Sequence, residues 1–251
     1  MTKKFLSLLQ IIAILIAMIF GYKAYQELKT LWDSQASTSA LKTLAVTENT
    51  HPFDRKIDFT SLEKINSDIL AWVYVPDTNI DYPVLKGQSD DGYLYQNIDK
   101  NYDPLGSITT FNDTDTTFNK AQTFIYGHNG VKDMMFDTLT QYTDETFREE
   151  HPIFYVYTKN KTYECSIFSV FIADESEKET YKHDFEIASI EHVERINELI
   201  ERNSYPDLEK ENTGEYINNE IFTLFTCYGN IGTPKRILIN ATAVKTKYII
   251  D

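Results

Sequence analysis

Features that are scarce or missing exclude several classes of protein. The chain of 251 residues has only 9 Gly, 7 Pro and 2 Cys, too few for a collagen-like, low-complexity or disulfide-framework protein. It has no CxxC, HExxH, calcium-loop, phosphate-loop or dinucleotide pattern, so we expect neither a metal nor a cofactor. Acids outnumber bases by 38 to 24, and no basic cluster offsets the net charge of −14. This charge disfavours nucleic acid as a partner.

One long uncharged stretch lies near the amino terminus. Phe5–Tyr22 follows Lys3 and Lys4 and would span about 27 Å as a helix, close to the thickness of a bilayer core. A cleaved signal peptide is the alternative, but no small-x-small site follows the stretch, which favours a retained single-pass anchor. The basic amino end predicts a cytoplasmic tip and an extracellular remainder, although two lysines beyond the helix reduce this asymmetry.

The composition divides the chain into three predicted parts. Residues 1–22 form the cytoplasmic tip and the transmembrane signal-anchor, and residues 23–55 form a polar, partly helical stalk. From residue 56 to residue 251, β-branched and aromatic runs are bounded by turn residues, which is typical of a strand-rich globular domain.

Eight strand candidates dominate the globular part. Without βαβ alternation, they predict a mainly β fold, a closed or nearly closed antiparallel barrel with peripheral helices. One helix of about four turns is expected between residues 182 and 219, because five apolar residues there have helical spacing: Ile190, Val193, Ile196, Leu199 and Ile200. Shorter helices are expected at 59–66, 134–141 and 144–149. The strand candidates are 70–75, 82–85, 107–111, 123–126, 153–157, 163–172, 221–227 and 236–244.

The two cysteines have different surroundings in the sequence. Cys227 ends the apolar run Ile221–Cys227 and precedes a Tyr-Gly-Asn turn, so a rigid strand would present its thiol beside a loop. Cys165 lies in the middle of a strand candidate and is expected to be buried and inert. Cys227 is therefore the candidate nucleophile. The alternative is that it too is a small buried hydrophobic residue.

A histidine and an arginine are the candidates for proton transfer and charge stabilisation. His128 follows Tyr126 and Gly127 at a strand end, and imidazole titrates near neutrality, which suits a proton donor to a leaving amine. Arg236 begins the last strand, and a hairpin-like return would bring it close to Cys227, where a permanent charge would stabilise an oxyanion. The alternatives are a hydrogen-bonded loop histidine and a surface arginine. We expect His192 to lie on the solvated face of its helix.

Three separated segments together resemble the sortases, the cysteine transpeptidases of Gram-positive cell surfaces. They are Thr-Leu-Phe-Thr-Cys at 223–227, Tyr-Gly-His at 126–128 and Lys-Arg-Ile at 235–237. Residues 72–76 and 80–84, with the helix that precedes the cysteine strand, resemble class B members. Several ordered motifs over residues 57–244 are more specific than any single match.

The resemblance implies an eight-stranded sortase barrel with an amino-terminal anchor and a defined chemistry. Cys227 would attack the carbonyl between the Thr of a C-terminal sorting motif and the next residue, and form a thioacyl intermediate. His128 would protonate the departing amine and then deprotonate the incoming one, while Arg236 would help to hold the oxyanion. Oxyanion and substrate contacts are also expected at Thr226, Leu224 and Phe225; many class B members have Ser in place of Phe225.

The sequence leaves the acceptor of the acyl group open. A peptidoglycan-precursor amine would anchor a surface protein to the cell wall, whereas a lysine of a pilin would extend a pilus. We prefer wall anchoring because it is the commoner class B role, and transfer to water is a further alternative. From another class of function, the chain would be a tethered surface-binding domain without catalysis. The sorting motif and the oligomeric state are not indicated.

Overall fold

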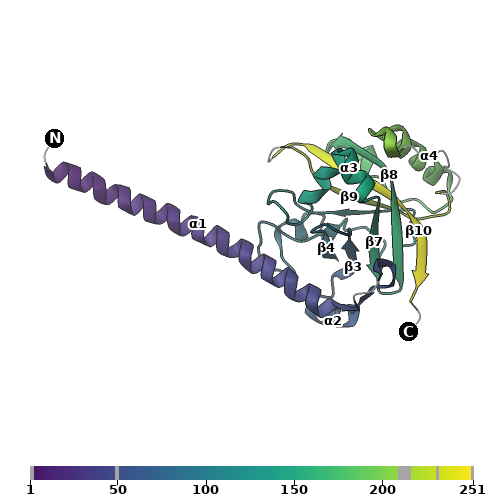
Figure 1. The fold of residues 1–251 in the computed structure, drawn as a ribbon, viewed down its shortest axis with the longest axis horizontal. Coiled ribbons are helices and arrows are strands. Elements are labelled where there is room, and N and C mark those ends of the chain that lie inside the picture. Colours follow the sequence, from purple (N-terminus) through teal and green to yellow (C-terminus); the bar gives the residue numbers. More distant parts are fainter. Residues whose placement is uncertain (1–2, 49–50, 209–215, 230–231, 250–251) are drawn as a thin grey trace. The chain divides into compact units, whose positions relative to one another are not determined.

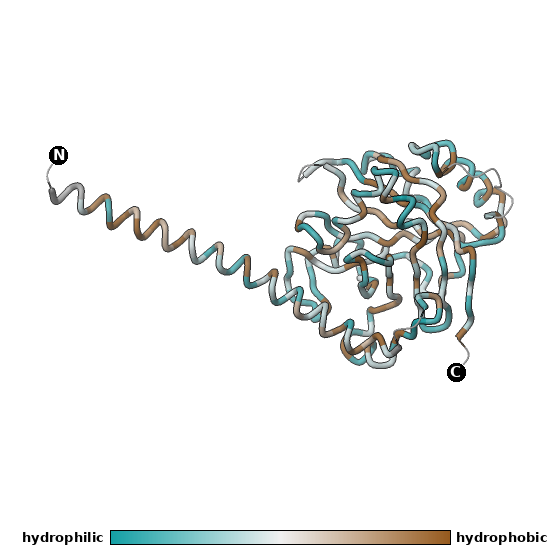
Figure 2. Tube along the Cα trace, in the orientation of Figure 1, coloured by the Kyte–Doolittle hydropathy of each residue, from teal (hydrophilic) through white to brown (hydrophobic). Residues whose placement is uncertain are grey.

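The structure is a computed structural model that describes residues 3–48, 51–208, 216–229 and 232–249 (Figure 1). The chain separates into two compact units, residues 1–40 and 41–251. Helix α1 (Lys3–Ala45) runs through the described part of the first unit. From Ser7 onward it is long and apolar enough to cross a membrane, with a mean hydropathy of 1.9 in its most apolar window (Figure 2). It is therefore a candidate membrane anchor.

The second unit contains a closed barrel of eight strands. Around the barrel the order is β10-β8-β7-β3-β4-β5-β6-β9, so β9 lies between β6 and β10. Each of the eight strand candidates coincides with one of these strands, which confirms the predicted fold class. The strands are β3 (Ile69–Tyr74), β4 (Asp81–Lys86), β5 (Thr109–Thr110), β6 (Gln122–Tyr126), β7 (Ile153–Thr158), β8 (Lys161–Asp174), β9 (Ile221–Cys227) and β10 (Lys235–Tyr248).

The barrel is not antiparallel throughout, which corrects one part of the prediction. β4 pairs with β5 in parallel, and so does β6 with β9. Parallel neighbours need a long crossover connection rather than a tight turn. Between β6 and β9 the chain completes β7, β8 and helix α4 (Ile190–Glu201) before it returns. A short sheet of β1 (Val46–Glu48) and β2 (Lys56–Ile57) lies outside the barrel and was not predicted.

Shorter helical segments connect the strands. α2 (Phe59–Ile65) and α3 (Glu145–Glu150) are both capped by aspartate side chains at their first turns. The helix expected at 134–141 is instead a 3₁₀ segment, η3 (Asp137–Thr143). The remaining 3₁₀ segments are η1 (Pro52–Asp54), η2 (Tyr93–Tyr95), η4 (Lys178–Tyr181) and η5 (Pro206–Leu208).

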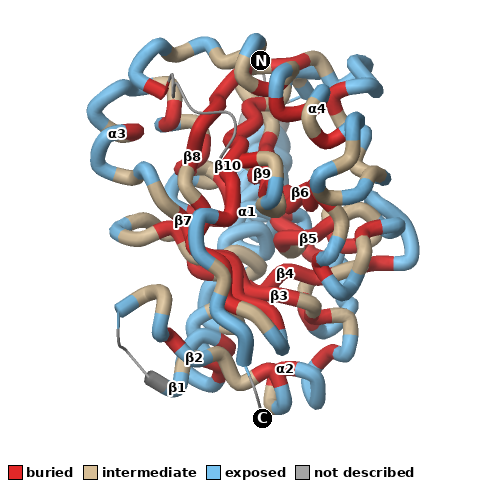
Figure 3. Tube along the Cα trace, turned by 90° about the vertical axis from the view of Figure 1, so that its right-hand side faces the viewer, coloured by how far each residue is buried: buried red, intermediate tan, exposed pale blue. Residues whose placement is uncertain are grey.

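β9 is buried on both faces, because one face points into the barrel and the other is covered from outside. Residues 221–226 are all buried (Figure 3), which explains why this strand is a continuous apolar run rather than an alternating one. Phe225 belongs to the outer cluster, where Ile196 and Leu199 of α4 pack against the barrel wall. The strand that carries Cys227 is thus held from both sides.

Helix α4 has 12 residues, fewer than the four turns expected, and its buried face differs from the predicted stripe. Ile190 is 75% exposed, whereas His192 is completely buried, so the solvated position expected for His192 is wrong. The reason is the face that packs. The buried residues His192, Arg195, Ile196 and Leu199 share one side of the helix. Ile190 lies on the opposite side, because it precedes His192 by two residues.

A buried chain of hydrogen bonds joins α4 to the barrel. Arg195 Nε donates to Gln122 Oε1 on β6 at 2.8 Å. Gln122 Nε2 donates to Thr223 Oγ1 on β9, and that hydroxyl donates to Asn240 Oδ1 on β10, both at 2.8 Å. All four residues are buried, so each would leave an unpaired polar group if its partner were removed.

Lys42 and Arg55 are tied to the barrel by one buried carboxylate. Asp81, at the start of β4, is 5% exposed. Its oxygens accept hydrogen bonds from Arg55 Nη2 at 2.7 and 3.0 Å and from Trp72 Nε1 at 2.6 Å. Lys42 Nζ lies 2.5 Å from the same carboxylate. Such a buried charge is stable only because cations and donors surround it.

Candidate active site

The barrel order brings the three candidate catalytic residues to one edge. Cys227 ends β9, and its Cα partner on the antiparallel neighbour β10 is Arg236. On the other side, Tyr126 of β6 pairs in parallel with Phe225 of β9. Because both of these strands end at the same edge, the residues after Tyr126 continue beside Thr226 and Cys227.

Two hydrogen bonds fix the loop that carries His128. Thr226 Oγ1 donates to the Gly127 carbonyl at 2.8 Å, and Asn129 Nδ2 donates to the Cys227 carbonyl at 2.9 Å. They hold the residues on either side of His128 against the end of β9. Gly127 leaves room for the end of the Ile108 side chain, which would have to move to admit a Cβ.

His128 is half-buried, and its surroundings set its tautomer and its charge. Nε2 lies 2.7 Å from the Leu94 carbonyl oxygen, which can only accept, so this nitrogen carries the hydrogen and Nδ1 is left for proton exchange. Burial lowers the pKa of His128; the Leu94 carbonyl opposes this, and the positive charge of Arg236 adds to it. The neutral imidazole is therefore favoured near pH 7, and its conjugate acid is a stronger donor than free imidazolium.

Arg236 is held by the turn that precedes β10 and by one carboxylate. Nη1 donates to the carbonyls of Thr233 at 2.9 Å and Lys235 at 3.0 Å, and Nη2 pairs with Glu175. Residues 230 and 231 of the expected turn lie outside the described residues. On either side of them the backbone is left-handed, with φ of +97° at Gly229 and +81° at Gly232, a conformation that favours glycine.

The environments of the two cysteine thiols differ sharply. Cys227 is partly exposed at the strand end, and Cys165 is completely buried in the middle of β8. Burial raises the pKa of the Cys165 thiol well above its usual value, which suppresses the reactive thiolate. Among the described residues, only Cys227 therefore combines access with a neighbouring imidazole and guanidinium.

A family model described as the sortase domain matches residues 73–244. The chain belongs to the sortase family. Sortase B of Staphylococcus aureus is 28% identical to it over 97% of this chain and 98% of that protein. The structure of Clostridium perfringens sortase B superposes with a TM-score of 0.67 at 26% identity, covering 74% of this chain and 98% of that one. A Staphylococcus aureus sortase B–substrate complex gives 0.65 at 27% identity, covering 76% and 85%.

These likenesses confirm the class B resemblance and the barrel. The protein is a class B sortase, and hence a cysteine transpeptidase. Sortases are cell-surface enzymes that act on sorting-motif substrates and amine nucleophiles, which agrees with the candidate membrane anchor of this sortase.

The expected oxyanion and substrate residues of the sortase lie on opposite faces of β9. Phe225 shares the outer face with Cys227, because alternate residues of a strand point the same way, and its ring stacks on Tyr126 at 4.8 Å between centroids. Thr226 and Leu224 occupy the inner face and are 1% and 0% exposed. The Leu224 side chain thus supports the strand from the side opposite to the thiol.

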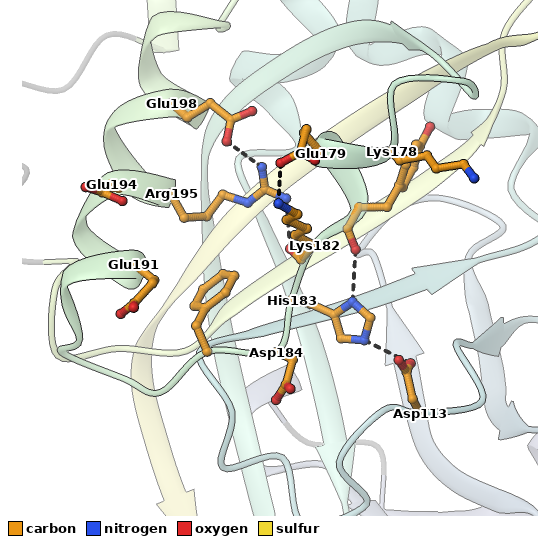
Figure 4. A pocket seen from close by; sticks show the side chains of 12 residues that line it. Asp113, Lys178, Glu179, Lys182, His183, Asp184, Glu191, Glu194, Arg195 and Glu198 are labelled. Carbon is orange, nitrogen blue, oxygen red and sulfur yellow. Dashed lines mark hydrogen bonds and ion pairs between the residues drawn. The ribbon is translucent and has the colours of Figure 1, made fainter.

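A pocket of about 810 Å³ lies outside the barrel of the sortase, between α4 and residues 178–185 (Figure 4). His183 lines it, with Nε2 3.0 Å from Asp113 and Nδ1 2.9 Å from the Tyr181 carbonyl. The pocket does not include Cys227. Phe111 connects the two places, because its ring lies 5.2 Å from His183 and 6.1 Å from Phe225.

Three features of the sortase site were missed by sequence reasoning. The Leu94 carbonyl is a main-chain group, so no residue type indicates it. Glu175 is one of 38 acids, and only the fold shows that it meets Arg236. Phe111 offered a signal as an aromatic residue at the end of a strand candidate, but its contact with Phe225 depends on the parallel pairing of β6 and β9.

Proposed function

We propose that this sortase is a single-pass membrane enzyme that attaches surface proteins to the cell wall through a thioacyl intermediate on Cys227. The observation that carries the proposal is topological. Cys227 ends the middle strand of three neighbours. His128 follows the strand on one side, and Arg236 is the second residue of the strand on the other. A nucleophile, a proton carrier and a cation thus share one edge of a rigid barrel.

The steps follow from these positions. Neutral His128 takes the Cys227 thiol proton on Nδ1, and the thiolate attacks the carbonyl carbon of the Thr in the sorting motif. The C–N bond breaks as the imidazolium gives that proton to the leaving amine. Neutral His128 then takes a proton from the incoming amine, which attacks the thioester and releases the thiolate. Arg236 and backbone amides near Thr226 stabilise the oxyanion in both halves.

The substrate is a peptide whose reacting carbonyl lies at the exposed end of β9, beside Cys227, because the rest of the strand is buried on both faces. A related sortase B was solved as a substrate complex, which supports a peptide site in this fold. We assign the contact beside the thiol to Phe225, whose ring is held by Tyr126, Phe111 and Tyr181. Leu224 and Thr226 act from the inner face, the former by packing and the latter through its main chain.

The anchor sets where the reaction takes place. The apolar helix of α1 follows Lys3 and Lys4, so the positive-inside rule places the amino end in the cytoplasm and the barrel outside the cell. Sorting-motif proteins arrive at the same membrane surface. A peptidoglycan-precursor amine is our first choice of acceptor, and a pilin lysine is the alternative.

The test uses the full chain in detergent micelles with a panel of sorting-motif peptides. Each peptide is tested with triglycine as a stand-in for the peptidoglycan-precursor amine, with a lysine-bearing pilin peptide, or with neither. Intact-mass analysis should show a peptide adduct that Cys227→Ala abolishes, that Cys165→Ala retains, and that triglycine resolves. Resolution by the lysine peptide alone would favour pilus assembly, and resolution by water alone would favour hydrolysis. No adduct with any peptide would contradict the proposal and favour a tethered binding domain.

A further inference from the structure

We propose that Glu175 is a positioning residue of the active site, which orients the guanidinium of Arg236 through a side-chain ion pair. The assignment rests on the proposed function, in which Arg236 acts on the reacting carbonyl. Glu175 follows the last residue of β8, and β8 flanks β10 on the side away from Cys227, where Ala173 is the Cα partner of Arg236. Arg236 thus lies between the thiol strand and the carboxylate.

Hydrogen bonds hold the main chain at Glu175 in place. The Glu175 N–H donates to the Pro234 carbonyl at 2.8 Å, which ties the loop after β8 to the turn before β10. The loop also braces itself: Asp174 Oδ1 accepts from the Ser176 N–H and hydroxyl, at 3.0 and 2.6 Å. Glu177 Oε1 accepts from the Asp174 N–H at 2.8 Å. These bonds fix the main chain at Glu175, and the ion pair with Arg236 Nη2 then places its carboxylate.

Counting donors shows what this arrangement leaves for a substrate. A guanidinium has five N–H groups in a planar fork. Nη1 donates to the carbonyls of Thr233 and Lys235, and Nη2 pairs with Glu175. Among the described residues, one N–H on Nε and one on Nη2 then have no acceptor. Three contacts with fixed groups set the plane of the fork, and the two remaining donors suit an oxyanion or a peptide carbonyl.

The pair acts on geometry rather than on stability or charge. The Glu175 side chain is 53% exposed and that of Arg236 is 19% exposed, and such surface pairs contribute little to folding. A carboxylate beside Arg236 also reduces its positive field at the thiol, so its benefit lies in orienting the donors. Correct placement of a charged donor matters far more to a reaction rate than its mere presence.

The experiment is a double-variant cycle in the full chain, with the first-order rate of thioacyl formation measured by intact mass over a range of peptide concentrations up to saturation. Glu175→Ala should slow acylation about 10-fold with KM changed less than about two-fold, because an orienting contact is lost and a binding contact is not. Glu175→Asp should restore part of the rate. Glu63→Ala, which removes an exposed acid of α2 that pairs with Lys159 at 2.9 Å, is the matched control and should leave the rate unchanged.

Measuring the effect of Glu175→Ala in a second background tests whether Glu175 acts through Arg236. In an Arg236→Lys background, Glu175→Ala should lose less than about two-fold, because lysine has no fork to orient. Equal losses in both backgrounds, or an unchanged rate for Glu175→Ala in the wild type, would overturn the assignment while the transpeptidase function stands. A wild-type chain that forms no adduct would overturn the proposed function itself, and this assignment with it.

Discussion

Cys165 and Cys227 both lie opposite β10, yet the structure gives them opposite properties. Cys165 pairs with Ala243 in the middle of the wall and is completely buried, and burial raises its thiol pKa well above the usual value. Cys227 pairs with Arg236 at the edge and is partly exposed. The position along a strand, more than the residue type, decides whether a thiol packs or reacts.

The same contrast divides the Thr-Leu-Phe-Thr-Cys segment. Thr223 and Leu224 are completely buried, and Thr223 belongs to the hydrogen-bonded chain that joins α4 to the barrel. Cys227 lies at the other end of the segment, beside the loop of His128. The motif therefore has a buried part, Thr223 and Leu224, which holds the barrel wall together, and a reactive end, Cys227. Substitutions in the buried part should change stability, and substitutions at the reactive end should change the rate.

The largest expected effect comes from replacing each cysteine in turn by alanine. Cys227→Ala should reduce acyl transfer by more than about 10³-fold, because no other group replaces the nucleophile. Cys165→Ala should keep the rate and lower the free energy of unfolding by about 1 kcal/mol, because it leaves a small void in the wall. Peptide-adduct formation and urea unfolding measure the two quantities. Equal loss of adduct from both variants would show that the buried Cys165 and the partly exposed Cys227 do not differ in their role.

Arg236→Lys tests whether acylation needs the planar guanidinium of Arg236 as well as its positive charge. Lysine keeps the positive charge but cannot donate to Thr233, Lys235 and a substrate from one rigid plane. We expect acylation to slow by about 10²-fold while the unfolding midpoint stays close to that of the wild type. Stopped-flow or quenched mass analysis would follow the rate. Full activity in this variant would exclude Arg236 from oxyanion stabilisation.

Thr223→Val tests the buried part of the motif. Valine keeps the shape but removes the hydroxyl, so Gln122 loses an acceptor and Asn240 loses a donor, and both are buried. The free energy of unfolding should fall by about 2 kcal/mol, with little change in the acylation rate below the melting temperature. A variant of wild-type stability would show that the buried chain of hydrogen bonds contributes nothing net.

The parts that sequence reasoning predicted are those with a strong local signal. The run at 221–227 indicated a strand because an apolar stretch buried on both faces must be continuous, and the turn after it indicated an exposed thiol. The parallel pairing of β6 with β9 left no local signal, because barrel closure decides it among segments about a hundred residues apart. The exposed Ile190 and the buried His192 show a related limit: apolar spacing predicts a helix, but packing against the barrel decides which of its faces is buried.

The smallest expected effect is a shift in the pKa of His128. Burial lowers this pKa below 6.5, and the charge of Arg236 lowers it further. Replacing Arg236 by Gln removes the second cause and leaves the first, so the pKa should rise but stay below the free-imidazole value. NMR titration of the His128 ring would measure both proteins, with Lys235→Gln as the matched control for loss of a nearby surface charge. The same pKa in Arg236→Gln and wild type would mean that Arg236 has no electrostatic effect on His128. The difference between Cys227 and Cys165 would then rest on the exposure of the Cys227 thiol alone.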